Sequence, residues 1–311
     1  MKNDFKQLSS LTSRNIRLYF KDKMTFFISL ITPIILLVLF ITFLKNTMET
    51  ELIRGTQGYT LDDKLVHAFS GGWLFSSVLS VSCVTISFCS SMYVQDKLSG
   101  ASLDFAVAPV KKSTLRLSYV LSNLFSTIIV CLILFVLGLI YLAIVGFYLS
   151  LTDILFILLN ILLTSTFGTL LANFIWNFVS SQGAMGGICT LVSSLYGFIC
   201  GAYMPINSMG NAMKVFASFL PGTYSSVLFR YYYLNGVVNE IAKTAPPQMV
   251  DEVAKAFDMK FYFFGTEVSN LAMFILGLAT CLIFFLLLIL SPKFSKKEKH
   301  KVQKIDTKTT N

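Results

Sequence analysis

Long apolar runs separated by short polar stretches make up most of this 311-residue chain. A helix needs about 20 consecutive apolar residues to cross the hydrocarbon core of a bilayer. Six runs are long enough, and none contains Asp, Glu, Lys or Arg. One such charge at mid-span costs about 2.5–3.5 kcal/mol on insertion scales, so this absence supports all six assignments. The predicted spans are residues 25–44, 68–93, 117–146, 154–178, 183–203 and 269–290.

Before the first span, residues 5–21 have the pattern of an amphipathic helix. Basic side chains fall on one face at 100° per residue, and apolar side chains fall on the other. The apolar face consists of Phe5, Leu8, Ile16, Tyr19 and Phe20. This composition is typical of a helix that lies in the membrane interface, with basic groups toward lipid phosphates. An ordinary basic flank of the first span is the alternative. We expect residues 1–24 to form a cytoplasmic interfacial helix.

Between the fifth and sixth spans, residues 204–268 are too apolar for a free loop. Proline and glycine interrupt the first part, at Pro205, Gly210, Pro221 and Gly222, and leave pieces that look too short to span. We expect re-entrant or broken helices on the outer side, followed by a small external cap. The predicted fold is an all-α polytopic membrane protein. It has six transmembrane helices, an N-terminal interfacial amphipathic helix, and these broken helices between spans five and six.

Composition and charge add an orientation to this picture. Hydrophobic residues make up 55% of the chain and charged residues only 13%, whereas a soluble domain carries about 25% charged residues. Of the 25 Lys and Arg residues, 17 lie in residues 1–24, 94–116 and 291–311. By the positive-inside rule these regions are cytoplasmic, so we expect both termini there. The net charge of +9 then reflects orientation, and no nucleic-acid partner is expected. We expect one membrane domain over 25–290 and a basic cytoplasmic tail over 291–311.

Few residues in this chain are candidates for catalysis, metal binding or phosphate binding. The six cysteines lie in apolar segments without metal-site spacing, and the two histidines lie far apart in the sequence. No GxxxxGK[ST] phosphate-binding loop is present. We therefore expect no catalytic residue, no metal and no cofactor on this chain. An ion-coupled carrier usually has ionisable residues at mid-membrane, and the predicted spans contain none.

Two spans carry stripes of small residues at the same helical spacing. In the second span the stripe includes Ser76, Ser80 and Ser87. In the fifth span it includes Gly186, Thr190, Ser193 and Gly197. Small residues let membrane helices approach closely, so tight packing within one chain is one interpretation. A conduit wall or a subunit interface is the other.

Residues 95–113, between the second and third spans, contain a short apolar piece at the cytoplasmic edge. Gly100 and Pro109 bracket this piece, which includes Leu103 and Phe105. Apolar surface at such an edge indicates a docking element, and a plain loop is the alternative.

This arrangement resembles the permease subunits of ABC-2 type transporters over nearly the whole chain. In the segment after span two, Gly100 and Pro109 keep the family spacing and follow Asp96 and Lys97. Asp104 stands near the usual Glu position. A second motif lies at the outer end of span five. It consists of Gly201, Pro205, Leu220, Pro221 and Tyr224.

The resemblance implies a half-transporter in a bacterial plasma membrane. Two such chains, identical or different, would pair in the lipid bilayer, and separate ABC ATPase chains would bind ATP and Mg²⁺ below them. Coupling would pass through a short helix within 98–110. The implied coupling residues are Asp96, Lys97, Gly100, Leu103, Asp104, Phe105 and Pro109. A drug, peptide or lipid-like cargo would be exported. An ion-coupled carrier and a non-transport assembly or immunity protein are the alternatives.

Overall fold

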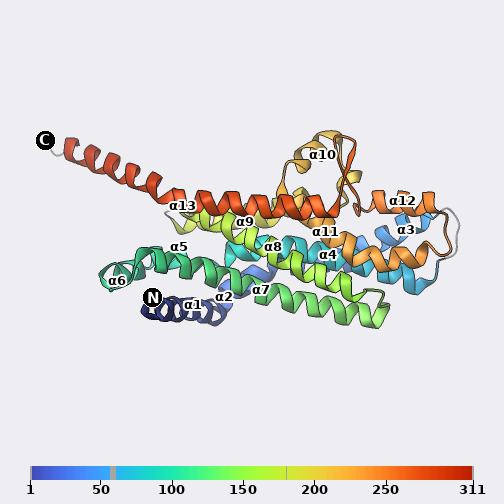
Figure 1. Ribbon diagram of the computed structural model, residues 1–311, viewed down its shortest axis with the longest axis horizontal. Helices are drawn as coiled ribbons and strands as arrows, with labels where there is room; N and C mark the ends of the chain where they lie inside the picture. The colour runs from blue at the N-terminus through green and yellow to red at the C-terminus, as the bar shows by residue number, and fades with distance from the viewer. Residues whose placement is uncertain (1, 57–60, 180, 310–311) are drawn as a thin grey trace.

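The chain forms an elongated helical bundle whose long helices lie side by side (Figure 1). The computed structural model describes residues 2–56, 61–179 and 181–309. Some side chains within these ranges lie outside the described part, namely those of Lys2, Asn3, Leu98, Ser102, Leu103, Ala106 and residues 291–309. The first half comprises α1 (Lys2–Lys21), α2 (Lys23–Leu39), the π-helical η1 (Phe40–Leu44), α3 (Lys45–Gly55), α4 (Asp63–Cys89), α5 (Met92–Leu98), α6 (Ala101–Val107) and α7 (Lys112–Val145). The second half comprises α8 (Leu151–Trp176), α9 (Gln182–Ile199), the 3₁₀ turn η2 (Ile206–Ser208), α10 (Asn211–Ser218), α11 (Pro221–Ile241), α12 (Pro247–Ala256), β1 (Phe261–Phe263), β2 (Thr266–Val268) and α13 (Asn270–Thr309).

Five helical stretches are long and apolar enough to cross a membrane, counting described residues only. They are Lys23–Gly55, Asp63–Lys97, Lys112–Val145, Leu151–Trp176 and Asn270–Leu290. These stretches contain all of the predicted spans 25–44 and 68–93. They contain nearly all of the predicted spans 117–146, 154–178 and 269–290. The fifth predicted span corresponds to α9, which has 18 residues and is not among the five. The six-span topology therefore stays a prediction.

Helix α4 forms the centre of the bundle. All of its apolar window is buried, and it contacts α2, α7, α8, α9 and α11. Its many hydroxyl groups are satisfied partly by its own backbone, as when Ser87 Oγ donates to the Cys83 carbonyl at 2.8 Å. A cross-helix bond joins it to α7, where Asn123 Nδ2 donates to the Ser87 carbonyl at 3.0 Å. Helix α4 is thus the common packing partner of the helices that surround it.

The segment between α9 and α13 differs from the sequence expectation in one respect. Pro221 and Gly222 do not divide it into short pieces, because Pro221 occupies the first turn of α11, which continues for 21 residues. Proline suits that position, since a first-turn N–H has no helical partner anyway. Most of α11 is buried against α4 and α8. The expectation that only short pieces follow Pro221 is therefore wrong.

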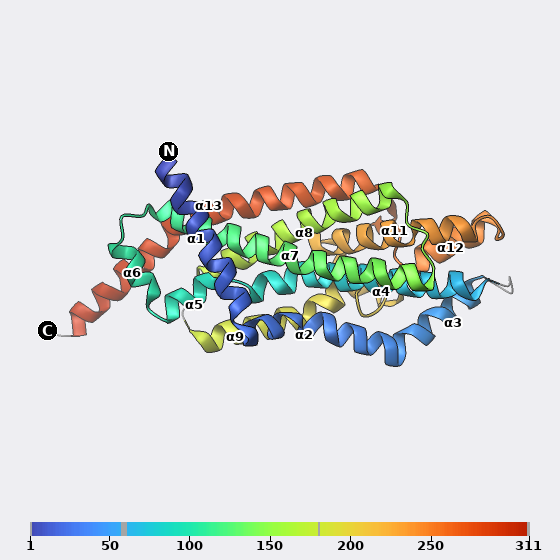
Figure 2. The ribbon, with the colours of Figure 1, turned by 90° about the horizontal axis from the view of Figure 1, so that it is seen from below.

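The two ends of the bundle carry different accessory elements (Figure 2). Helix α1 crosses the long helices at the end where α5 and α6 lie, which we call the α6 end. Helices α3 and α12 lie at the opposite end, which we call the α12 end. A two-stranded antiparallel hairpin, β1–β2, joins α12 to α13 and departs from the all-α expectation. Its two-residue turn has positive φ at Phe264 and Gly265, which is typical of a type I′ hairpin.

Candidate functional site

At the α6 end, an ionic cluster joins α1 to the segment after α4. Arg14 of α1 donates to both carboxylate oxygens of Asp96, at 2.7 and 3.3 Å. The hydroxyl of Tyr119 in α7 donates to the same carboxylate at 2.7 Å. Asp96 is buried, so these donors replace the water that its carboxylate has lost. Three elements that are distant in sequence are thereby held together at one side chain.

Helix α1 makes further contacts along the predicted coupling segment. The Arg14 guanidinium lies over the Phe105 ring, 5.1 Å from its centroid. Gln7 Nε2 donates to the Pro109 carbonyl at 3.4 Å, and Lys111 pairs with Asp4 at 2.8 Å. The amphipathic helix and residues 96–111 therefore form one contiguous surface.

Other predicted coupling residues occupy distinct positions around this surface. Lys97 donates to the Val179 carbonyl at 2.7 Å and so contacts the turn after α8. Gly100 has φ +84°, a conformation that disfavours side chains, and it allows α6 to begin at Ala101. Asp104 is exposed and Phe105 is half-buried. The exposed Val107 adds apolar surface beside them.

A groove extends along the bundle between α2 and α9. Its first part is a cavity of about 1200 Å³, lined by α2, α9 and the second half of α5. Its second part, of about 900 Å³, is lined by η1, α3, the η2 turn and α12. Leu39, Phe198 and Tyr203 line both parts, so the two are contiguous. The groove therefore reaches from the α6 end toward the α12 end.

The two small-residue stripes have different environments. Ser76, Ser80 and Ser87 of α4 are fully buried inside the chain. Three residues of the α9 stripe, Gly186, Thr190 and Ser193, line the first cavity. The fourth, Gly197, is covered by Tyr203. One stripe thus serves packing within the chain, and the other faces open space.

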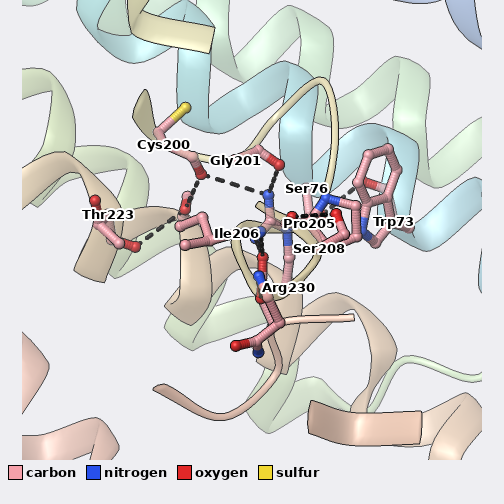
Figure 3. Close-up of polar contacts among 12 residues, drawn as sticks. Trp73, Ser76, Cys200, Gly201, Pro205, Ile206, Ser208, Thr223 and Arg230 are labelled. Carbon is pink, nitrogen blue, oxygen red and sulfur yellow. Dashed lines mark hydrogen bonds and ion pairs between the residues drawn. The ribbon is translucent and has the colours of Figure 1, made fainter. Parts of the chain in front are cut away.

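The second predicted motif, which follows α9, surrounds a buried ion pair. Arg230 of α11 and Asp258 are 2.9 Å apart, with exposed side-chain fractions of 0% and 2%. Arg230 also donates to the carbonyls of Cys200 and Gly201 and lies 5.6 Å from the centroid of the Trp73 ring. Figure 3 shows Arg230 reaching from its helix toward this turn.

Asp258 holds the other side of the same turn. Its carboxylate accepts backbone N–H groups of Ile206 and Asn207. Burial raises the pKa of Asp258, while Arg230 and these N–H donors oppose that shift. The pair therefore fixes the turn that contains Gly201 and Pro205, and Gly201 takes φ +71° there.

The remaining motif residues position the start of α11. Pro221 is in its first turn, and the Leu220 carbonyl accepts the Thr223 N–H at 3.1 Å. The Tyr224 hydroxyl donates to the Ser218 carbonyl at 2.6 Å. These contacts set the angle between α10 and α11.

Sequence reasoning missed the buried Arg230. The predicted spans contain no ionisable residue, but Arg230 lies in α11, between the last two of them, and is completely buried against α4. Its position was visible as a single cation in the apolar and aromatic run Val227–Tyr233. Its partner lies 28 residues further on, in a different element, so the sequence pattern did not pair them.

Comparison with known protein families gives a match over most of the chain. The family model described as ABC-2 type transporter matches residues 6–234. No curated protein matches the chain. Among the described residues, no group of three or more His, Cys, Asp or Glu side chains could hold a metal ion.

Proposed function

Because the chain belongs to the ABC-2 type transporter family, whose membrane domain lacks an ATPase site, we propose that it is the permease subunit of an ATP-driven exporter. A separate ABC ATPase would supply the energy, and a drug, peptide or lipid-like molecule would be the cargo. The family match carries this proposal. The groove between α2 and α9 supports it, since it offers a path along the bundle.

The α6 end is the proposed ATPase contact. Its exposed apolar side chain Val107 and half-buried Phe105 offer a surface for a partner groove. Because Arg14 contacts both Asp96 and Phe105, a movement of α6 would also displace α1. We propose that the two helices move together when the ATPase chains close.

A second permease chain is proposed to face the groove. A β-carbon at Gly183, Gly186 or Gly187 would have no other atom within 4 Å, so this part of α9 has room for a second helix to approach closely. Close approach at small residues is a common basis of helix association in membranes. The groove would then be half of a conduit between two chains.

The proposed orientation places the α6 end in the cytoplasm and the α12 end outside. The basic residues counted above support it by the positive-inside rule. Gln248 and Ser113 are exposed at opposite ends and suit a direct test. A cysteine at Gln248 should react with an impermeant thiol reagent in intact cells, and one at Ser113 should react only after lysis. The reverse pattern would contradict this orientation.

Co-purification tests the function itself. The tagged chain should be expressed with an ABC ATPase from the same organism and purified from the membrane. We expect a complex that hydrolyses ATP, whereas the permease alone should not. If the folded chain never retains an ATPase, the proposed function is wrong. Export that persists with a catalytically inactive ATPase and requires an ion gradient would favour the carrier alternative. No transport at all would favour an assembly or immunity protein.

A further inference from the structure

The groove between α2 and α9 has an uneven distribution of charge. Its charged lining residues are three carboxylates, Asp22, Glu51 and Glu252, and one guanidinium, Arg54. All four lie toward the ends, and the part between them has no charged side chain. Arg54 is 3.1 Å from Glu51 on the same helix, so this cation is already paired. Asp22 and Glu252 are left as the unbalanced charges of the groove.

Asp22 lies at the α6 end of the groove, where it caps α2. Its carboxylate accepts the Thr25 N–H at 3.2 Å and the Thr25 hydroxyl at 2.5 Å. These bonds hold the pKa of Asp22 below its ordinary value, so it is ionised at neutral pH. Lys21 and Lys23 flank Asp22 in the sequence, but neither lines the cavity. The side that faces the groove is therefore negative.

Glu252 lies at the other end of the groove, on α12. It is exposed, and no cation of the described residues lies within ion-pair distance of it. The neighbouring Asp251 differs, because Lys255 and Lys260 both contact it at 2.6 Å. Glu252 can therefore attract a positive group that enters this end.

The middle of the groove suits an apolar body with a positive group. Ile28, Ile31 and Ile35 supply an apolar wall, and hydroxyl groups of α9 lie opposite. Where the two cavities meet, the Phe198 and Tyr203 rings are 4.7 Å apart. Aromatic rings attract cations through their negative faces, and hydroxyl oxygens can accept from an ammonium group. No lysine or histidine lines either cavity, and the one arginine that does, Arg54, is paired with Glu51, so an anion would find no unpaired cation there.

We propose that the groove between α2 and α9 binds an amphipathic cation, an apolar molecule with an ammonium or guanidinium group. Asp22 and Glu252 attract the positive group at the two ends, and the isoleucine wall receives the apolar body. This inference rests on the proposed function, which it deepens by naming the chemical class of the cargo. An anionic lipid or a neutral polysaccharide does not fit this lining.

Two probes of nearly equal size and opposite charge test the proposal. Tetraphenylphosphonium is a cation and tetraphenylborate is its anionic counterpart. The full-length permease is placed in nanodiscs of zwitterionic phosphatidylcholine, and binding of each labelled probe is measured against empty nanodiscs. We expect saturable binding of the cation, at least about fivefold tighter than that of the anion, from one or two carboxylates near the site. Equal or tighter binding of the anion would overturn the proposal.

Carboxylate variants locate the site. Asp22→Asn keeps the helix cap, because asparagine caps as well as aspartate, and it removes the charge. Asp22→Asn and Glu252→Gln should each weaken cation binding several-fold and leave anion binding little changed. Asp63→Asn is the matched control, since Asp63 is exposed at the α12 end and does not line the groove. Unchanged cation binding in both groove variants would contradict the proposed site.

Native cysteines give an independent measure of occupancy. Cys189 and Cys89 line the first cavity, and Cys189 is half-buried, whereas Cys89 and the other four cysteines are buried. Tetraphenylphosphonium should slow alkylation of Cys189 by N-ethylmaleimide, as followed by mass spectrometry. If Cys189 is unreactive without the probe and neither probe binds, a second chain fills the groove and the proposal fails. Co-purification with the ATPase is measured separately, so failure here leaves the proposed function standing.

Discussion

Two arginine–aspartate pairs join distant segments, one at each end of the bundle, and they differ sharply in burial. Arg14 and Asp96 at the α6 end have exposed side-chain fractions of 35% and 7%. Arg230 and Asp258 have 0% and 2%. Breaking a buried pair costs far more than breaking one that water can reach. The difference indicates that the turn after α9 is rigidly held, while α1 and α5 can separate at moderate cost.

Removal of one member of the buried pair should have the largest effect. Arg230→Met leaves the Asp258 carboxylate buried without its cation, and such an unpaired charge costs about 3–5 kcal/mol. We expect a large loss of protein from the membrane and a lower unfolding temperature for what remains. Buried cysteines permit the measurement, because a thiol-reactive fluorogenic dye reports unfolding. Glu240→Gln is the control, since it breaks only the exposed pair with Lys243.

A double variant sharpens this result. Arg230→Met with Asp258→Leu removes both charges, and apolar replacement of a buried pair is often neutral or stabilising. The double variant should therefore recover part of the stability that the single variant loses. If the single and the double variant lose the same stability, the unpaired Asp258 carboxylate is not the cause of the loss.

At the α6 end, Phe105→Ala is expected to have the next largest effect. Loss of an aromatic anchor often costs about 2 kcal/mol or more in a protein interface. ATPase association should weaken while membrane abundance stays normal. Both are measured from the same cells, by blot and by co-purification. Phe264→Ala serves as the control, because this exposed ring lies in the hairpin after α12. If membrane abundance falls instead, Phe105 contributes mainly to the folding of this chain, through its contact with α1.

Arg14→Met tests the half-buried pair directly. Water can reach Arg14 and Tyr119 still donates to Asp96, so the cost to folding should be only about 1 kcal/mol. The unfolding temperature should fall slightly, and far less than for Arg230→Met. Arg17→Met is the matched control, since Arg17 is exposed on the same helix. A fall in unfolding temperature as large as that of Arg230→Met would contradict the expected difference in stability between the two ion pairs.

Lys111→Met should have the smallest effect. Lys111 and Asp4 pair at 2.8 Å with both side chains exposed, and such pairs contribute little. We expect unfolding temperature and ATPase association to match those of the neighbouring variant Lys112→Met. A selective loss of association in Lys111→Met would show that this pair orients α1 for docking.

The sequence predicted the long helices well, because apolar length is a direct physical requirement of the bilayer. Helix α1 and the break at Gly100 also follow from local patterns, namely amphipathic period and the conformational freedom of glycine. Proline alone did not tell whether Pro221 ends one helix or begins another. It begins α11, whose length depends on burial against α4 and α8.

The candidate site was less predictable than the fold. The serine stripe of α4 and the glycine-containing stripe of α9 have the same spacing, yet one is buried and the other lines a groove. Periodicity identifies a face of a helix, but the neighbours that cover this face come from tertiary packing. For the same reason, the sequence pattern did not predict the Arg230–Asp258 pair. Its two members come together only when α11 packs beside α4.

The buried position of α4 has a consequence for how the chain enters the membrane. Among the five candidate spans it has the lowest mean hydropathy, although it is the one most enclosed by protein. During synthesis α4 leaves the ribosome before α7, α8 and α11, so it first meets lipid on the faces that they later cover. Bonds such as Thr85 to the Val81 carbonyl shield its hydroxyls in that interval. Biogenesis of this chain thus depends on a helix most of whose packing partners arrive only after it has been inserted.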